Sequence, residues 1–318
     1  MPRFEPVTAL RPGAHVRVVA PASPFPVADF EAGVARLRTR YRVSFEPEIV
    51  ARAGYLAGDD ARRLGELRRA LADPSVDAIV AARGGYGATR LLPELSPTEV
   101  AGGGKLLVGF SDLTALHALW ARAGLRSLHG PMVAALGRAE AATVGAWLAS
   151  AEGVPPDPIG DLDCLVRGRA EGPLLGGNLA VLAALCGTPH APPLDGAILL
   201  LEDVGEAPYR VDRMLTTLRA AGWLDRVAGV VLGRFTQCAP GEDGRTVTDA
   251  LRDRLGDLAV PVVAGLHAGH VADALALPLG APARLDGECG TLHVFEGVGS
   301  SDGSKGWHAT RKFVGSSR

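Results

Sequence analysis

Short apolar runs alternate with amphipathic stretches through the first half of the chain. Residues 15–20, HVRVVA, run directly into the turn sequence PASP, and residues 76–81 and 105–110 are similar apolar runs. Apolar residues spaced three and four apart mark helices between these runs. The predicted strands are 15–20, 76–81 and 105–110, and the predicted helices are 30–40, 60–72 and 112–123. Strand, turn and helix in repetition are typical of a parallel sheet with crossover helices.

The pattern breaks at residues 149–169, where VPPDP cannot hold a regular helix. Beyond this segment the alternation resumes, with strands predicted at 197–201, 227–232 and 261–266 and helices at 179–186, 211–221 and 246–255. We therefore predict an α/β protein with an N-terminal Rossmann-like parallel-sheet domain and a C-terminal α/β domain. The predicted parts are residues 1–148, a linker at 149–169, residues 170–297, and a disordered tail of linker composition at 298–318.

Composition limits the class of partner. Lys and Arg number 33 and Asp and Glu number 35, which gives a formal charge of −2, and 47% of the 318 residues are hydrophobic. Such an apolar chain is expected to fold, and its near-neutral balance removes the electrostatic argument for nucleic acid or an anionic membrane as the main partner. The 41 glycines follow no collagen-like period, so their surplus needs another explanation.

Cysteine spacing and the first residues bear on the compartment. The four cysteines, Cys164, Cys186, Cys238 and Cys289, form no Cys-x-x-Cys pair. The start MPRFEP lacks the apolar core of a secretory signal. The longest stretch without charged side chains, residues 173–194, contains several prolines and a Gly-Gly-Asn sequence that suit a loop and a short helix better than a membrane span. We expect a cytoplasmic protein with reduced cysteines.

Ser111 is the sharpest candidate for chemistry. The apolar run 105–110 ends on Gly109-Phe110-Ser111, and a helix is predicted to begin at once. A serine on a tight strand-to-helix turn presents its hydroxyl above the sheet edge, and the next backbone N–H can receive an oxyanion. The usual Gly-x-Ser-x-Gly pattern is not met, because Leu113 occupies the last position. The alternative is that Ser111 only caps the helix.

A nucleophilic serine needs a base, and the base needs an orienting acid. His270 is the favoured base, because it follows the predicted strand 261–266 and is preceded by a glycine. His267 and His129 are the competing histidines, and a structural role for any of them stays open.

Glu202 is the favoured acid, since it directly follows the five apolar residues 197–201, and its neighbour Asp203 is the main rival. Ser111, Glu202 and His270 each lie just past the end of an apolar strand. In open α/β sheets, sites are built at the carboxyl ends of strands.

A glycine-rich segment after the strand 76–81 offers further backbone donors. Residues 83–87 are Arg-Gly-Gly-Tyr-Gly, which permits unusual φ angles and close backbone approach. This sequence departs from the dinucleotide-binding pattern Gly-x-Gly-x-x-Gly, and no phosphate-binding loop with Gly-Lys-Ser/Thr occurs. The histidines and cysteines lack metal-ligand spacing. We therefore expect a site without a cofactor or a metal ion.

Taken together, these motifs resemble the LD-carboxypeptidase family of serine peptidases. The similarity extends from about residue 16 to about residue 295. The motifs that carry it are VAPAS at 19–23, ARGGYG at 82–87, GFSDLT at 109–114, HGPM at 129–132, LGGNL at 175–179, LEDVGE at 201–206, YRVDRML at 209–215, GH at 269–270 and LPLG at 277–280. Their joint occurrence in this order makes the resemblance specific.

The resemblance implies a two-domain fold with the site at the domain interface. It implies that Ser111 is the nucleophile, Glu202 the acid and His270 the base, with an oxyanion hole formed by the N–H groups of Asp112 and of Gly84 or Gly85. Family members are typically cytoplasmic, metal-independent homodimers. Many of them remove the terminal D-alanine from muropeptide tetrapeptides during cell-wall recycling.

Other features of the site and the function stay open. Arg83 and Arg234 are candidates for binding the substrate's terminal carboxylate, and surface or interdomain ion pairs are their alternative role. The nearest rival function is that of the microcin C immunity branch of the same family, which hydrolyses an aminoacyl or peptidyl link to a nucleotide-like group. From a different class, the chain could be a catalytically silent module that binds peptides in the same cleft.

Overall fold

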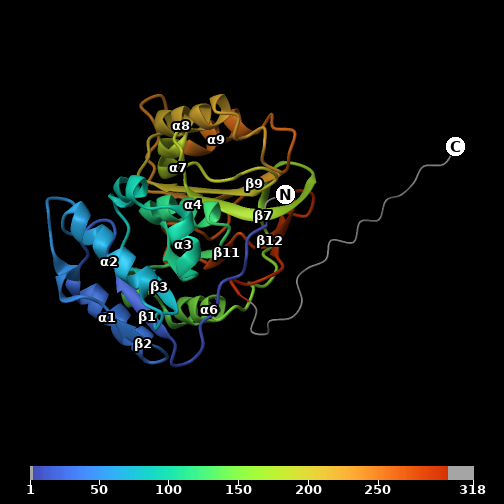
Figure 1. Cartoon of the computed structure of the whole chain (residues 1–318). Coiled ribbons are helices and arrows are strands. Elements are labelled where there is room, and N and C mark those ends of the chain that lie inside the picture. The colour runs from blue at the N-terminus through green and yellow to red at the C-terminus, as the bar shows by residue number, and fades with distance from the viewer. Residues whose placement is uncertain (1–2, 300–318) are drawn as a thin grey trace.

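The computed structural model describes residues 3–299 and contains two β-sheets flanked by helices (Figure 1). The predicted α/β class with a parallel-sheet first half and a second α/β half is confirmed. Most of the predicted tail, residues 300–318, lies outside the described residues. Its first residue, Val298, is fully buried and accepts a hydrogen bond at its carbonyl oxygen from the N–H of Val7 (3.0 Å).

The first sheet has six strands in the order β11-β5-β4-β3-β1-β2. All neighbours are parallel except β11, which runs antiparallel to β5. The central strands are buried along their whole length, which explains their continuous apolar sequence. The strands are β1 (His15–Val19), β2 (Arg42–Ser44), β3 (Ala78–Ala81), β4 (Leu106–Gly109), β5 (Ser127–His129) and β11 (Leu277–Leu279).

Helices connect these strands and cover the sheet. The α-helices are α1 (Val27–Arg38), α2 (Asp60–Ala72), α3 (Pro97–Gly103), α4 (Thr114–Arg122), α5 (Val133–Arg138) and α6 (Ala141–Ala151). Three short 3₁₀ helices are η1 (Pro47–Val50), η2 (Ala88–Glu94) and η3 (Ser111–Leu113). Several starts are fixed by side-chain caps: the Asp59 carboxylate accepts from the N–H of Arg62, and the Ser96 hydroxyl accepts from the N–H of Glu99.

The second sheet has seven strands in the order β13-β12-β7-β8-β9-β10-β6. Its centre, β7 to β10, is parallel, and the outer strands are antiparallel to their neighbours. The strands are β6 (Asp163–Val166), β7 (Arg169–Asn178), β8 (Ile198–Val204), β9 (Gly229–Thr236), β10 (Val262–Ala264), β12 (Pro282–Asp286) and β13 (Thr291–Val294). Its helices are α7 (Leu179–Leu185), α8 (Pro208–Ala220) and α9 (Val247–Leu255).

Several predicted elements differ from the structure in their bounds. The strand predicted at 197–201 continues as β8 to Val204, so Glu202 lies inside the strand and not after it. The ladder between β8 and β9 shifts register between Leu201 and Asp203, and β8 continues beyond Glu202 to Val204. The segment predicted as a linker, 149–169, contains β6. The predicted division into domains stays a prediction.

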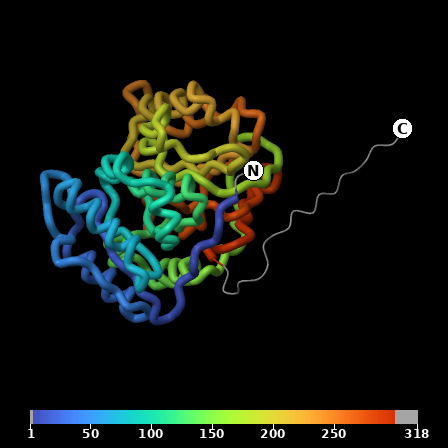
Figure 2. Tube along the Cα trace, viewed as in Figure 1, coloured from blue at the N-terminus to red at the C-terminus, as the bar shows by residue number. Residues whose placement is uncertain are grey.

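The two sheets share one hydrophobic core. Leu107 and Leu116 of the first half belong to the same buried cluster as Leu175 and Leu199 of the second. In Figure 1, α7, α8 and α9 gather at the top of the view, α1 and α2 lie at the lower left, and α4 lies between them. The turn that carries Ser111 and the helix α4 are therefore packed against the second sheet. In Figure 2, the last described residues, near 299, run beside the N-terminal segment.

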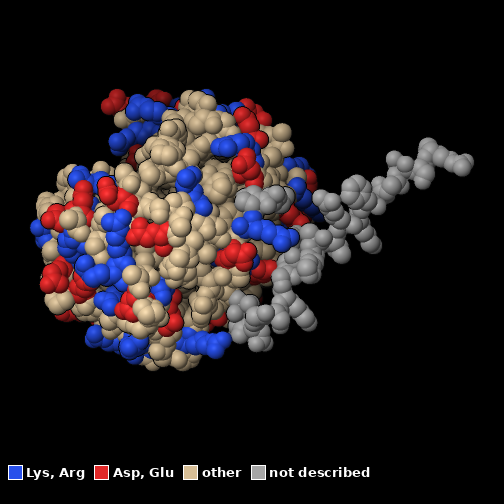
Figure 3. Space-filling model, in the orientation of Figure 1, with Lys and Arg blue, Asp and Glu red and all other residues tan. Residues whose placement is uncertain are grey.

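The surface carries both signs of charge. Figure 3 shows Lys and Arg interspersed with Asp and Glu over the visible face. This distribution agrees with the near-neutral composition, and the visible face has no extended region of one sign. Among residues 3–299, no helix is long and apolar enough to cross a membrane.

One hydrogen bond joins the helix after the nucleophile turn to the second sheet, and it gives a first prediction. The Thr114 hydroxyl, 1% exposed, accepts from the N–H of Asn178 at 2.9 Å. Thr114→Val keeps the shape and leaves that buried N–H without its acceptor, so we expect the free energy of unfolding to fall by about 1–3 kcal/mol. Urea denaturation measures the change.

The matched control is Thr216→Val on the exposed face of α8, which should shift stability by less than about 0.5 kcal/mol. Equal effects of the two substitutions would contradict a role for Thr114 in joining the two sheets.

Candidate functional site

Ser111 lies on a strained turn between β4 and α4. Its φ is +63°, one of three positive values among the described residues other than glycine. Such a conformation costs about 1–2 kcal/mol for a residue with a side chain. The preceding residue, Phe110, is extended, and the chain then forms η3. This is the nucleophile-elbow geometry that the sequence predicted, and it turns the hydroxyl out of the sheet.

The structure brings together the three residues that the sequence favoured. His270 Nε2 lies 3.1 Å from Ser111 Oγ, and His270 Nδ1 lies 2.9 Å from Glu202 Oε2. The Phe110 ring packs against the imidazole at a centroid distance of 4.8 Å and an interplanar angle of 61°. The distances match a serine, a base and an acid in hydrogen-bond sequence. Their catalytic roles stay a prediction at this point.

Glu202 is held in the interior with one hydrogen-bond partner. Its side chain is fully buried, and its Oε1 has no partner among the described residues. A Cβ on Gly269 (φ +100°) would lie 2.3 Å from Glu202 Oε2, so only glycine lets the histidine loop pass this close. A buried carboxylate strongly favours a positive charge on its partner. The arrangement can therefore orient the His270 imidazole toward Ser111.

Asp203, the other candidate for the acid, makes different hydrogen bonds. Its carboxylate accepts from Asn178 Nδ2 (2.9 Å), from the N–H of Ala180 (2.9 Å) and from the N–H of Val204 (2.8 Å). Burial raises its pKa to about 6, and these hydrogen bonds oppose the shift. Asp203 thus fixes the start of α7 beside β8 and makes no hydrogen bond to His270.

The two competing histidines also have other surroundings. His267 Nδ1 lies 2.6 Å from Asp273 Oδ2, and its Nε2 lies 2.5 Å from Arg234 Nη2, so both ring nitrogens are occupied. His129 is 1% exposed and packs edge-on against Phe110. Burial lowers the pKa of His129 to about 3, which keeps the ring neutral. Neither histidine is hydrogen-bonded to Ser111.

The predicted oxyanion donors lie beside the serine. A Cβ on Gly84 would be 3.0 Å from Ser111 Cβ, which shows how closely this backbone passes Ser111. Within residues 3–299, no hydrogen bond uses the N–H of Gly84 or Gly85. Asp112 directly follows Ser111, so its N–H lies next to the serine in the chain. The buried Asp112 carboxylate accepts from the N–H of Ala88 at 2.7 Å. This geometry is suited to an anion that forms next to Ser111.

The two predicted carboxylate-binding arginines are occupied by other contacts. Arg83 is exposed and donates from Nη1 to the carbonyl oxygen of Pro24 at 2.7 Å. Arg234 is half-buried at the end of β9 and pairs with His267. No hydrogen bond joins either guanidinium to the three central residues, and their substrate-binding role stays a prediction.

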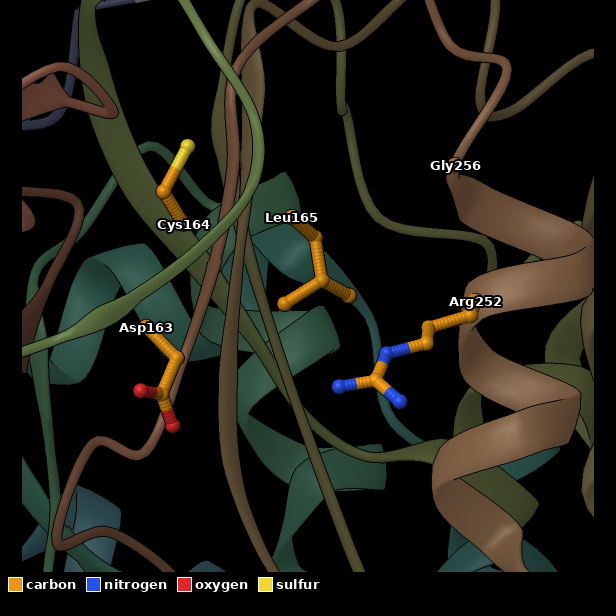
Figure 4. Close-up of a pocket in the computed structure, with 5 residues that line it drawn as sticks. All are labelled: Asp163, Cys164, Leu165, Arg252 and Gly256. Atoms are coloured by element: carbon orange, nitrogen blue, oxygen red, sulfur yellow. The ribbon is translucent and has the colours of Figure 1, made fainter.

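We also searched the described residues for groups of metal ligands and for cavities. Over the described part of the chain, no group of three His, Cys, Asp or Glu side chains is placed to hold a metal ion, and the four cysteines are unpaired. A hollow of about 440 Å³ lies between β6 and α9 (Figure 4). Its lining residues are Asp163, Cys164, Leu165, Arg252 and Gly256, none of which belongs to the candidate site.

Sequence reasoning missed Arg63, which is fully buried behind the glycine-rich segment. Its Nη1 donates to the carbonyl oxygen of Gly87 at 2.8 Å. The signal was present in the helix pattern, because residues 63, 66, 67 and 70 share one face of α2 and all four are buried. The charges at 63 and 66 made the helix look polar and hid its buried face.

Comparison with known families gives two matches that together span most of the chain. Residues 16–130 match the LD-carboxypeptidase N-terminal domain, and residues 171–285 match the LD-carboxypeptidase C-terminal domain. Ser111 lies in the first matched segment, and Glu202 and His270 lie in the second. The candidate site therefore draws its residues from both matched domains.

Individual proteins match over nearly the whole chain. A protein of Streptomyces coelicolor, to which carboxypeptidase activity is provisionally assigned, is 47% identical over 89% of this chain and 94% of its own. The solved muramoyltetrapeptide carboxypeptidase of Oxalobacter formigenes is 32% identical, with a TM-score of 0.81 over 89% of this chain and 99% of its own. The microcin C7 self immunity protein MccF shares the fold, with a TM-score of 0.83 at 22% identity over 93% of this chain and 99% of its own.

The crowding at Gly269 gives a prediction for the site. In Gly269→Ala the new methyl group must displace the Glu202 carboxylate, so we expect the rate at which a fluorophosphonate labels Ser111 to fall about tenfold or more. Gly265→Ala is the matched control, because the φ of Gly265 is +97° and the nearest atom, Asp163 Oδ2, would be 3.8 Å from the new Cβ. Both variants carry similar backbone strain.

Labelling rates and melting temperatures of the two variants separate the effects. Equal labelling by both would show that contact between residue 269 and Glu202 does not shape the site.

Proposed function

Because the chain belongs to the LD-carboxypeptidase family of serine peptidases, we propose that it releases the terminal D-alanine from muropeptide tetrapeptides in cell-wall recycling. The family assignment makes the chain a hydrolase. The observation that supports a serine mechanism most directly is the hydrogen-bonded sequence Ser111–His270–Glu202. The 32% identity to a muramoyltetrapeptide carboxypeptidase over almost its full length supports the choice of substrate.

In the proposed first step, Ser111 Oγ attacks the carbonyl carbon of the bond that precedes D-alanine. His270 Nε2 takes the hydroxyl proton, and Glu202 accepts a hydrogen bond from Nδ1 and stabilises the imidazolium. The tetrahedral oxyanion is received by the N–H of Asp112 and one from Gly84 or Gly85. Each such donor typically lowers the barrier by roughly 3–4 kcal/mol.

In the second step, the carbon–nitrogen bond breaks and the peptide remains on Ser111 as an ester. His270 gives its proton to the departing D-alanine amine, so the imidazole is neutral again. A water molecule then attacks the ester carbonyl while His270 takes one of its protons. The proton returns to Ser111 Oγ as the shortened peptide leaves, which restores the starting state.

The choice of a terminal residue requires recognition of a free carboxylate. Arg83 and Arg234 remain our candidates, because an arginine fork matches a carboxylate in shape and charge. Arg234 follows Gly233, whose Cβ would lie 3.0 Å from Glu202 Cβ, so the Arg234 backbone is near the acid. We further propose that the protein acts in the cytoplasm as a homodimer, with a small peptide as its partner and with neither nucleic acid nor a membrane.

The alternative substrate is an aminoacyl or peptidyl nucleotide, as suggested by the shared fold with MccF. A nucleotide base needs an aromatic side chain to stack on. Between residues 208 and 246, Trp223 is buried and Phe235 packs against the core. Tyr209 is the only aromatic residue that is well exposed in this segment, and the Arg213 guanidinium lies over its ring. This segment therefore provides one well-exposed aromatic ring, and the muropeptide is our primary proposal.

The main test is incubation with purified muropeptide tetrapeptide followed by mass spectrometry. We expect the wild type to remove one alanine and Ser111→Ala to be slower by at least about a thousandfold, because the nucleophile is gone. A chelator should leave the wild-type rate unchanged.

Each alternative predicts a different result. Equal release by wild type and Ser111→Ala would overturn the nucleophile assignment. Cleavage of an aminoacyl-nucleotide analogue without cleavage of the tetrapeptide would move the function to the immunity type. Binding of the tetrapeptide without cleavage of either compound would indicate a silent binding module.

Arg234 gives a separate prediction about specificity. Arg234→Gln should raise KM for the tetrapeptide about tenfold with a smaller change in kcat, since ground-state binding of the carboxylate is lost. It should also reduce the preference for the free acid over the C-terminal amide of the same peptide. Arg83→Gln is the parallel variant, and an unchanged acid-to-amide preference in both would exclude these two arginines.

A further inference from the structure

The glycine-rich segment after β3 is tied down at both of its ends. At the near end, the carbonyl oxygen of Gly84 accepts from the N–H of Ser23 at 3.2 Å, and the N–H of Tyr86 donates to Ser23 Oγ at 3.1 Å. At the far end lies the peptide group between Gly87 and Ala88. The N–H groups of Gly84 and Gly85 lie at the Ser23 anchor, and the Gly87–Ala88 peptide follows within three residues, so the second anchor limits how far the segment that carries them can move.

The Gly87–Ala88 peptide group is hydrogen-bonded on both of its edges to side chains of opposite charge. Its carbonyl oxygen accepts from Arg63 Nη1 at 2.8 Å, and its N–H donates to Asp112 Oδ2 at 2.7 Å. Hydrogen bonds to charged groups are stronger and more directional than neutral ones. A peptide group held in this way has little freedom to rotate.

The side chains of Arg63 and Asp112 are buried against the backbone of the glycine-rich segment. Arg63 is fully buried and Asp112 is 3% exposed, so water competes little with either contact. A Cβ on Gly87 (φ +131°) would lie 2.6 Å from Arg63 Nη1, which shows that the guanidinium packs directly on this residue. Burial raises the pKa of Asp112, while the N–H of Ala88 and the charge of Arg63 lower it and favour the ionised form.

Arg63 reaches further than this one peptide group. The same Nη1 also donates to the carbonyl oxygen of Pro21, and Nη2 pairs with Asp60. The guanidinium therefore connects the segment after β1 to the segment after β3. Asp112 directly follows Ser111, so the second charge connects the segment after β3 to the nucleophile turn.

We propose that Arg63 and Asp112 act as positioning residues, which clamp the Gly87–Ala88 peptide and thereby hold the N–H groups of Gly84 and Gly85 toward the oxyanion. The inference rests on the proposed serine mechanism and adds a role for two side chains, those of Arg63 and Asp112, which do not touch the substrate. An oxyanion hole works because its donors need no rearrangement when the charge develops. The clamp supplies that rigidity from outside the cleft.

Arg62 provides a matched control on the same helix. It is largely buried and donates to the carbonyl oxygens of Ala20 (3.1 Å) and Ala57 (2.9 Å) and to Glu66 (2.7 Å). It therefore resembles Arg63 in type, burial and number of contacts, but it makes no hydrogen bond to the glycine-rich segment. Substitution of Arg62 tests whether loss of any buried arginine of α2 lowers the catalytic rate to the same extent.

The experiment compares Arg63→Met and Arg63→Lys with Arg62→Met. For both Arg63 variants we expect kcat on the tetrapeptide to fall about ten- to hundredfold with KM changed by less than about twofold, because only transition-state contacts weaken. Affinity for a peptide boronic acid, which forms a tetrahedral adduct on the serine, should fall by a similar factor. Arg62→Met should lower the melting temperature but keep kcat within about threefold.

A folded Arg63 variant with wild-type kcat and boronate affinity would overturn the proposal, and so would an equal loss in Arg62→Met. Arg63→Lys keeps the buried positive charge, which guards against a variant that fails to fold. Hydrogen exchange of residues 82–92 gives an answer that does not depend on the substrate: we expect faster exchange in Arg63→Lys, and unchanged exchange would overturn the clamp. If the wild type cleaves no muropeptide, the proposed substrate fails while the exchange result still decides the clamp.

Discussion

A carboxylate without access to water controls the geometry of the candidate site. Glu202 is fully buried, and among the described residues its one hydrogen-bond partner is His270. An ionised group in this setting costs several kcal/mol unless a compensating charge lies next to it. In the proposed mechanism, the imidazole supplies that charge when it takes the proton of Ser111. Burial of the acid, the position of the base and the reactivity of the serine are therefore parts of one electrostatic arrangement.

This arrangement requires the two sheets to pack tightly against each other. Ser111 follows β4 of the first sheet, Glu202 lies on β8 of the second, and His270 lies on the segment between β10 and β11. A small shift between the sheets would therefore change the distances among these three residues. The shared apolar cluster and the bond from Asn178 to Thr114 resist such a shift. The short strand β11 strengthens the connection, since it leaves the second half of the chain to pair with β5.

The sequence predicted the central strands and the three candidate residues because these signals are local. Apolar runs mark buried strands, and a polar residue next to such a run stands out. The choice between Glu202 and Asp203 was not local. Neighbouring side chains of a strand point to opposite faces, and only the fold determines which face carries His270. The return of β11 to the first sheet was also beyond prediction, since a three-residue strand with a central proline carries no strand signal.

Several buried charges among the described residues lie behind the segments of the candidate site. Arg63 and Asp112 lie behind the glycine-rich segment, and Glu202 lies behind His270. Glu66, whose pKa burial raises to about 7, accepts from the N–H of Ala20 at the end of β1. A well-packed apolar core is often as stable as one with buried ion pairs or more stable, so stability alone does not account for these groups. Directional hydrogen bonds to backbone N–H and carbonyl groups do account for them, because apolar side chains cannot fix a loop at the precision that an oxyanion site requires.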